Sequence, residues 1–90
     1  MASRKLLGYQ QITSLAAATA LTIPAGTSAI EVVAITQACR WRADGTNPTT
    51  SVGMPIFANS PKLFEIEQFS ALRFIETAGS ANLEVTYYGT

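Results

Sequence analysis

The sequence predicts an all-β fold, either a small antiparallel β-sandwich or a jelly-roll-like barrel, with an extended N-terminal arm. Several short segments alternate apolar and polar residues with a period of two, which places successive side chains on opposite faces of a strand. Gly, Pro and Asn separate these segments at short intervals. The 90 residues suffice for one domain, and about six to eight short strands are typical of a sandwich or barrel.

The N-terminal segment is expected to be an arm over residues 1–12, followed by a single β domain over residues 13–90. The arm combines an adjacent basic pair with apolar residues that follow it closely: Arg4, Lys5, Leu6, Leu7 and Tyr9. Such a segment suits an acidic or edge-strand surface of a neighbouring subunit. The alternative is that residues 7–12 pair within the chain's own sheet.

Within the domain, residues 30–35 are β-branched and nearly all apolar, which predicts a central strand. Residues 72–76 and 82–88 flank a short turn and predict an antiparallel hairpin. Thr36-Gln37 separates residues 30–35 from the strand expected over residues 39–43 at hairpin spacing. A bulge or a bent continuous strand is the alternative there.

Two shorter strands are expected over residues 20–23 and 63–67. In the second of these, alternation places two apolar side chains inward and two carboxylates outward: Phe64 and Ile66, then Glu65 and Glu67. Residues 14–20 are rich in alanine, which favours a helix, but the segment is short and its neighbours alternate. Helix and strand therefore both remain open for it.

The segment after residue 43 is expected to form a long, uncharged loop. Asp44-Gly45 supplies the positive φ that ends a strand, and the Asp44 carboxylate suits a turn closed on its own backbone. The residues expected to hold the loop are Asp44, Gly45, Pro48, Gly53 and Pro55. Alternation places Arg40 and Arg42 on one strand face, where they either pair with a carboxylate or contact a partner. Trp41, on the opposite face, is either a core residue or an interface anchor.

The composition argues against an enzyme and against a cofactor. The chain has no His, so Ser-His and Cys-His nucleophile pairs and His-bearing metal sites cannot form. Its one cysteine, Cys39, cannot make a Cys-only zinc site or a redox pair and is expected to be a buried, inert thiol. Glu65 and Glu67 are spaced about 7 Å apart on one face, as paired catalytic carboxylates can be, but a solvated strand face explains them fully.

The charge balance predicts assembly with other proteins. Charged residues are 13% of the chain and the formal net charge is zero, whereas hydrophobic residues are 48%. A soluble monomer usually has about 25% charged residues and a net charge away from zero. We therefore expect a homo-oligomer, a trimer or dimer, with much of its surface covered. Six basic and six acidic residues do not supply the basic cluster of a nucleic-acid-binding protein. No apolar run reaches the roughly 18 residues of a membrane span, and no signal peptide is expected.

Three blocks of the sequence resemble small virion proteins of tailed bacteriophages. They are the Arg40-Trp41-Arg42 strand with the loop through Pro55, Leu72-Arg73-Phe74-Ile75, and the closing strand that ends in Tyr87-Tyr88. The resemblance covers roughly residues 20–90. It implies a structural component of the phage particle, made in the host cytoplasm and located in the virion, and it brings no catalytic residues with it.

The function expected from these observations is decoration of a phage capsid by a cement protein that bridges capsid subunits. The partner is then the major capsid protein or another virion protein. A tail, neck or fibre-base component is the alternative, and a carbohydrate-binding adhesion module is a further one. The residues expected at the interface are Arg4, Lys5, Leu6, Leu7, Tyr9, Arg40, Arg42 and Tyr88.

Overall fold

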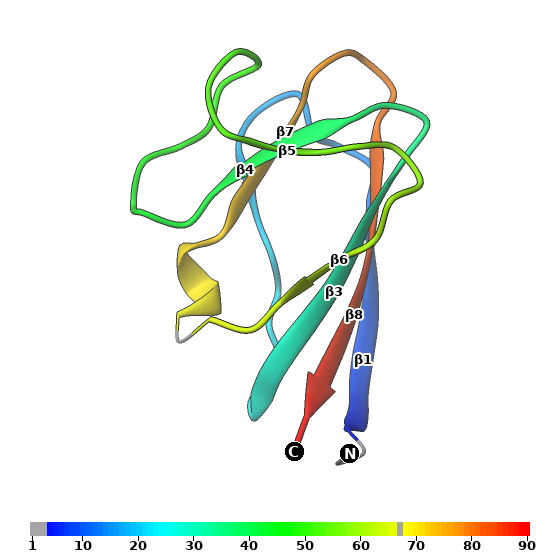
Figure 1. The fold of residues 1–90 in the computed structure, drawn as a ribbon, viewed down its shortest axis with the longest axis vertical. Helices are drawn as coiled ribbons and strands as arrows, with labels where there is room; N and C mark the ends of the chain where they lie inside the picture. Colours follow the sequence, from blue (N-terminus) through cyan, green and yellow to red (C-terminus); the bar gives the residue numbers. More distant parts are fainter. Residues whose placement is uncertain (1–3, 67) are drawn as a thin grey trace.

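Eight strands form two four-stranded antiparallel sheets in residues 4–66 and 68–90, the part of the chain that the computed structural model describes (Figure 1). Across these residues, no helix has the length and hydropathy needed to cross a membrane. Sheet A contains, in spatial order, β1 (Lys5–Ile12), β8 (Asn82–Gly89), β3 (Thr27–Ile35) and β6 (Lys62–Phe64). Sheet B contains β2 (Thr19–Ala20), β7 (Arg73–Glu76), β4 (Cys39–Arg42) and β5 (Met54–Ile56). A 3-10 turn, η1 (Phe69–Ala71), precedes β7. The predicted all-β sandwich is confirmed.

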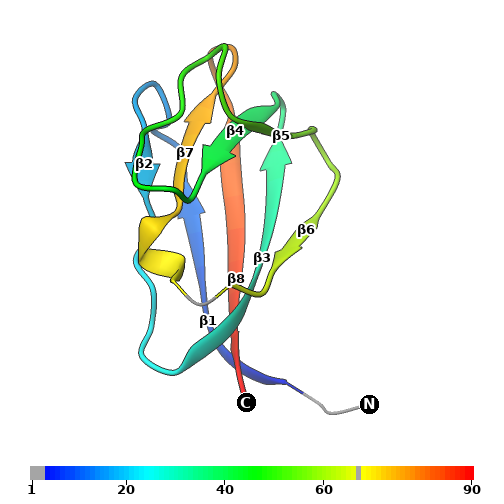
Figure 2. The same ribbon diagram turned by 60° about the vertical axis from the view of Figure 1, so that its left-hand side comes forward.

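The two middle strands of sheet A carry much of the core. In β8, Leu83, Val85 and Tyr87 are buried, and the residues between them face outward, as strict alternation requires. β3 lies between β8 and β6, so the predicted central strand is confirmed. Figures 1 and 2 show β1, β8 and β3 running alongside one another.

Aromatic side chains join the two sheets. Phe64 of β6 is almost fully buried, and its ring centroid lies 4.8 Å from that of Trp41 and 6.0 Å from that of Phe74. Both pairs meet edge to face, the arrangement that the ring quadrupoles favour. Because Trp41 and Phe74 belong to sheet B, Phe64 anchors the short edge strand β6 to the opposite sheet.

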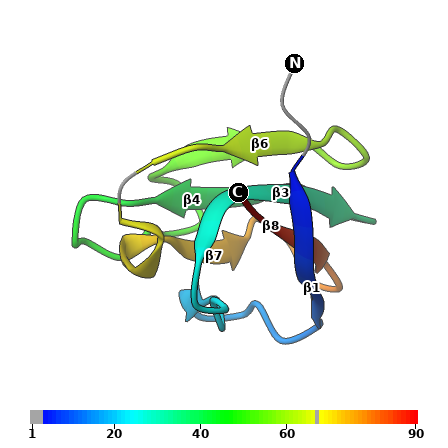
Figure 3. The same ribbon diagram turned by 90° about the horizontal axis from the view of Figure 1, so that it is seen from below.

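The N-terminal segment is an edge strand of the domain itself, not an extended arm. β1 pairs antiparallel with β8 from Lys5 opposite Gly89 to Ile12 opposite Leu83. The start of β1 and the end of β8 therefore lie at the same end of the molecule (Figures 1 and 3). The strand is held because Ile12 is buried in the core and Gln10 accepts a hydrogen bond from the Tyr87 hydroxyl at 2.5 Å. Residues 1–3 of the expected arm lie outside the described residues.

The hairpin predicted over residues 72–76 and 82–88 is wrong, and residues 30–35 and 39–43, for which hairpin spacing was one of the open alternatives, do not form a hairpin either. β7 pairs with β2 and β4 in sheet B, whereas β8 pairs with β1 and β3 in sheet A. β3 and β4 likewise belong to different sheets. The short links instead carry the chain from one sheet to the other, and each contains a residue with positive φ, Thr36 at 78° and Ser80 at 74°. Periodicity identifies strands, but it does not say which strands share a sheet.

The segment over residues 14–20 is neither a helix nor a long strand. Leu15 is buried, and its carbonyl accepts a hydrogen bond from the backbone N–H of Glu76 at 2.9 Å. This long-range bond ties the segment to sheet B, and only Thr19–Ala20 pairs as β2. The strands expected over residues 20–23 and 63–67 are shorter than predicted, although Leu21, Ile23 and Ile66 still pack against the core. Glu67 lies outside the described residues.

Candidate interaction surface

The outer face of sheet A brings together side chains from all four of its strands. Its members point away from the core: Leu6, Tyr9 and Gln11 of β1, Glu84, Thr86 and Tyr88 of β8, Glu31, Val33 and Ile35 of β3, and Leu63 of β6. Three of the apolar side chains are strongly exposed, Leu6 at 66%, Tyr9 at 62% and Leu63 at 43%. Because they share one face, this face is the candidate interaction surface.

The register of the sheet places these side chains in rows. Tyr9 is opposite Thr86, Thr86 is opposite Glu31, and Glu31 is opposite Leu63. This row crosses the full width of the sheet, about 14 Å at the usual spacing between strands. Leu6 lies opposite Tyr88 in a neighbouring row.

Two carboxylates with neutral hydrogen-bond partners and a third that is paired with an arginine lie on this side of the sheet. Glu84 accepts a hydrogen bond from Gln11 Nε2 at 2.7 Å, and Glu31 accepts a long one from the Tyr88 hydroxyl at 3.5 Å. Glu65, just beyond β6, forms an ion pair with Arg4. Arg4 thus lies against the acidic side of its own domain.

The predicted contact residues of the N-terminal segment are divided by a register shift between Leu6 and Gly8. Leu6 and Tyr9 face outward, and Lys5 is exposed at the start of β1. Leu7 packs against the core instead, and its side chain fills the space beside Gly89, where an added Cβ would lie 3.0 Å from it. Leu7 is therefore a packing residue.

The two terminal tyrosines point to opposite faces, as consecutive strand residues do. Tyr88 is half-exposed on the outer face of sheet A, whereas Tyr87 is buried and donates its hydroxyl hydrogen bond to Gln10. Burial raises the pKa of the Tyr87 phenol to about 12. Of the two, only Tyr88 is placed to contact a partner.

The raised pKa of Tyr87 predicts that the free energy of unfolding falls at alkaline pH. The ordinary pKa is 10.0, so the folded state favours the neutral phenol. Its stabilisation is complete below about pH 10 and is lost as the pH rises through about 12. Denaturant unfolding at about pH 8 and about pH 11.5 should show a larger fall in unfolding free energy for the wild type than for Tyr87→Phe. Equal falls in the two proteins would contradict this assignment.

A second region surrounds the loop over residues 43–53, on sheet B. Arg40 donates from Nε to the Thr50 carbonyl at 3.1 Å and from Nη1 to the Gly53 carbonyl at 2.9 Å. The loop therefore lies against the outer side of β4. Pro48, within the loop, is buried, and Gly53 has a φ of 143° that a side chain would strain. Pro55, in β5, is exposed opposite Arg40.

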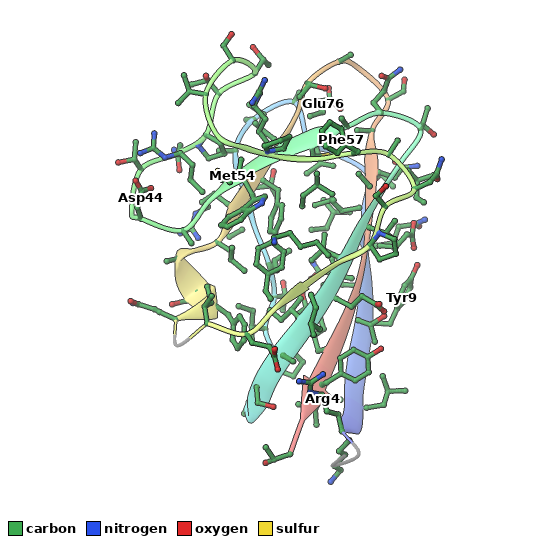
Figure 4. All side chains as sticks on the ribbon, viewed as in Figure 1. Arg4, Tyr9, Asp44, Met54, Phe57 and Glu76 are labelled. Atoms are coloured by element: carbon green, nitrogen blue, oxygen red, sulfur yellow. The ribbon has the colours of Figure 1, made fainter. Side chains whose placement is uncertain are left out.

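Arg42 and Asp44 close the start of this loop. The Arg42 guanidinium donates two hydrogen bonds to the Asp44 carboxylate, at 3.0 and 2.5 Å. Asp44 also accepts a hydrogen bond from the Thr46 backbone N–H at 3.3 Å, the geometry of an Asx turn, and Gly45 has a φ of 87°. The hydrogen bond from Arg42 lowers the pKa of the Asp44 carboxyl below its ordinary value. In Figure 4, Asp44 lies beside the end of β4, on the opposite side of the view from Tyr9 on β1.

Replacing Asp44 by Ala should lower the melting temperature by a few degrees at neutral pH and by less in acid. A carboxyl whose pKa is depressed by folding stabilises above its unfolded pKa, and this stabilisation is lost as the pH falls through the folded pKa. Thermal melts at about pH 7 and about pH 2 measure how the difference in melting temperature between the wild type and Asp44→Ala changes with pH. Asp44→Asn is the matched control, because it keeps an acceptor for the Thr46 N–H. If the difference in melting temperature is the same at both pH values, the ion pair between Asp44 and Arg42 does not contribute to stability.

Trp41 lies at the boundary between the core and an open cleft. Its ring packs on Phe64, and Lys62 Nζ lies 5.7 Å from its centroid. Its Nε1 is buried and has no hydrogen-bond partner among the described residues. The cleft has a volume of about 550 Å³ and is lined by Trp41, Arg42, Ala43, Asp44, Val52, Gly53 and Met54. Trp41 is therefore mainly a packing residue with one edge on a surface cleft.

The described residues contain no group of three or more Cys, Asp or Glu side chains that could hold a metal ion. Cys39 is fully buried, and burial, together with the charge of Glu76, raises the pKa of its thiol to about 11. It is therefore a neutral thiol at physiological pH. Glu65 is exposed and paired with Arg4.

Sequence reasoning missed several residues of these surfaces. Glu31, Glu84 and Leu63 complete the outer face of sheet A, and Val52, Met54 and Phe57 are exposed apolar residues near β5. Alternation within residues 30–35 and 82–88 does indicate that Glu31 and Glu84 face outward. It gives no sign that the two strands are adjacent, and adjacency is what makes them one surface.

No protein-family model, curated protein or solved structure matches this chain in the comparisons made.

Proposed function

We propose that the protein is a structural component of a tailed-bacteriophage virion that decorates the capsid and bridges capsid subunits through the outer face of sheet A. The observation that carries this proposal is the exposure of Leu6, Tyr9 and Leu63 on that one four-stranded face. Because the chain has few charged residues, contact with another protein would remove these exposed apolar side chains from water. The resemblance to phage virion proteins supplies the kind of particle.

The shape of the surface supports a protein partner over a small ligand. The exposed side chains are spread over rows that span about 14 Å rather than gathered in a cavity. Small-molecule sites are concave and enclose most of their ligand. A broad sheet face with apolar and polar side chains interspersed is the form of a protein interface.

Bridging would gain strength from multivalency. The proposal includes self-association into a dimer or trimer, so that one oligomer engages several capsid subunits. Each additional contact then forms within the same complex and raises the overall affinity without a strong single contact. Such a link resists outward pressure because neighbouring subunits separate only when several contacts break together.

A tail, neck or fibre-base position in the same particle uses the same surface and differs in copy number. Quantitative mass spectrometry of purified virions should find on the order of hundreds of copies if the protein covers the capsid. About a dozen or fewer would place it at the tail or neck and overturn capsid decoration.

Attachment is tested by adding purified protein to virions that lack it, then sedimenting the particles. The double variant Leu6→Gln/Tyr9→Gln should attach much more weakly than the wild type. Phe57→Gln is the matched control, because Phe57 is equally exposed at 66% but follows β5 of the other sheet. Equal attachment of all three proteins, or no attachment of the wild type, would contradict the proposed interface.

A further inference from the structure

We propose that the outer face of sheet A docks a basic protein surface, in which arginine or lysine side chains flanked by apolar ones meet Glu31 and Glu84. This deepens the proposed function, on which it rests for the identification of the capsid as the source of the basic surface. The docking chemistry itself follows from the sheet and its charges.

The two carboxylates form the centre of the face. Glu31 of β3 lies opposite Thr86 of β8, and Glu84 lies opposite Val33, so Glu31 and Glu84 are diagonal neighbours on adjacent strands. Diagonal side chains are about 7–8 Å apart, close enough for one or two cationic side chains to contact both. Like charges at this distance repel each other, so a cation placed between them would relieve that repulsion.

Neither carboxylate has a cationic partner in residues 4–66 and 68–90. Glu84 accepts a hydrogen bond from the neutral amide of Gln11, and Glu31 accepts one from the Tyr88 hydroxyl. The ion pairs formed among these residues are Arg4 with Glu65 and Arg42 with Asp44. The carboxylates of Glu31 and Glu84 can therefore pair with cationic side chains of another protein.

Apolar side chains flank the centre on both sides. Leu63 lies directly beside Glu31 on β6, and Tyr9 lies on β1 beyond Thr86 in the same row. Both are exposed, at 43% and 62%. From one edge of the sheet to the other, the row contains an apolar side chain, a hydroxyl, a carboxylate and a second apolar side chain. A partner surface that complements it has a basic residue with apolar neighbours.

The chain itself provides a precedent for a guanidinium on this side of the molecule. Arg4 precedes β1, at one edge of sheet A, and pairs with Glu65, which follows β6 at the other edge. Both side chains remain partly exposed, at 41% and 55%. An arginine from a partner would find the same chemistry at Glu31 and Glu84.

A second copy of this chain does not supply that basic surface. Stacking two outer faces of sheet A would place Glu31 and Glu84 against each other. The arginines of sheet B are already engaged within their own chain: Arg40 with the Thr50 and Gly53 carbonyls, Arg42 with Asp44, and Arg73 with the Ser70 and Leu72 carbonyls. Lys62 lies over the rings of Trp41 and Phe64, and Lys5, exposed at the start of β1, is a single charge at the edge of the face that carries Glu31 and Glu84. We therefore assign the occupant to a different, basic protein.

A peptide probe tests the docking chemistry without a capsid. A synthetic hexapeptide of alternating leucine and arginine is titrated into the isotopically labelled full-length protein and followed by NMR, with a leucine–glutamate hexapeptide as the matched probe. The arginine peptide should shift the backbone amides of β3 and β8, and its binding should weaken as salt rises. Glu31→Gln/Glu84→Gln should weaken binding about three- to tenfold, the effect of losing one or two exposed ion pairs. Glu76→Gln, on sheet B, is the control and should bind like the wild type.

Several outcomes would overturn the proposal. Equal binding of the glutamate peptide, perturbations confined to β4 and β7, or an unchanged affinity of the double variant would each do so. Salt-sensitive dimerisation of the wild type that the double variant loses would instead identify a second copy as the occupant. If Glu31→Gln/Glu84→Gln attaches to virions like the wild type, this inference fails while capsid decoration stands. Peptide docking without virion attachment would leave the inference intact and overturn decoration.

Discussion

Deletion of residues 1–12 is expected to abolish cooperative folding of the domain. The deletion removes β1, which contributes buried Ile12 and the packing of Leu7, and it breaks the hydrogen bond between Gln10 and Tyr87. It also removes the strand that pairs with one side of β8, so the backbone groups on that side lose their partners. Burial of one aliphatic side chain contributes about 1.5–3 kcal/mol. With the lost strand pairing added, the deficit approaches the roughly 5–15 kcal/mol that holds a small domain together.

Circular dichroism and thermal melting measure this outcome directly. The matched control is the full-length variant Leu6→Gln/Tyr9→Gln, which alters the two most exposed apolar residues of β1 and leaves its inward side chains in place. The control should keep a melting transition close to that of the wild type, since surface substitutions usually change stability by less than about 0.5 kcal/mol. A truncated protein that melts within a few degrees of the wild type would show that residues 1–12 are a detachable arm after all.

Replacing Phe64 by Ala is expected to cost about 3–5 kcal/mol of unfolding free energy. Phe64 is 2% exposed and holds β6 against the other sheet through Trp41 and Phe74. Its removal leaves a cavity between two rings that belong to sheet B, and β6 pairs with β3 at only three positions. So short a strand cannot close around the cavity without losing its register.

The neighbouring substitution Leu63→Ala is the control for Phe64→Ala. Leu63 precedes it on the same strand and points to the opposite face, where it is 43% exposed. Its truncation should change the free energy of unfolding by less than about 1 kcal/mol in denaturant titrations. Similar losses for the two variants would mean that β6 is stabilised by its backbone pairing rather than by Phe64. Leu63→Ala is also expected to weaken partner binding. The two adjacent residues therefore have different roles, with Phe64 stabilising the fold and Leu63 contacting the partner.

Parts of the candidate surface could be predicted from the sequence. Leu6, Tyr9 and Tyr88 were expected at an interface from their position in the chain, and the structure places Leu6 opposite Tyr88 on one sheet face. Arg40 and Arg42 were grouped with them, yet they lie on sheet B and bond to their own loop. Strand alternation places each side chain on a face, but it does not assign that face to a sheet.

The sequence by itself determined the elements whose signal is local. The β-branched, apolar run of residues 30–35 and the alternation of residues 82–88 predicted β3 and β8, and Asp44-Gly45 predicted a turn with positive φ. These features depend on backbone sterics and on which side of a strand meets water, and neighbouring residues settle both.

Only the tertiary structure decided which strands are partners. The links at Thr36 and Ser80 carry the chain between sheets, so strands adjacent in sequence are separated in space, and β1 joins β8 across nearly the whole chain. Pairing depends on burying the inward faces of all strands at once, and several arrangements of the same strands satisfy the local pattern equally well. The juxtaposition of Glu31, Glu84, Leu63 and Tyr9 follows from that pairing. The proposed docking face is therefore a product of the fold, assembled from residues that no single segment of the sequence brings together.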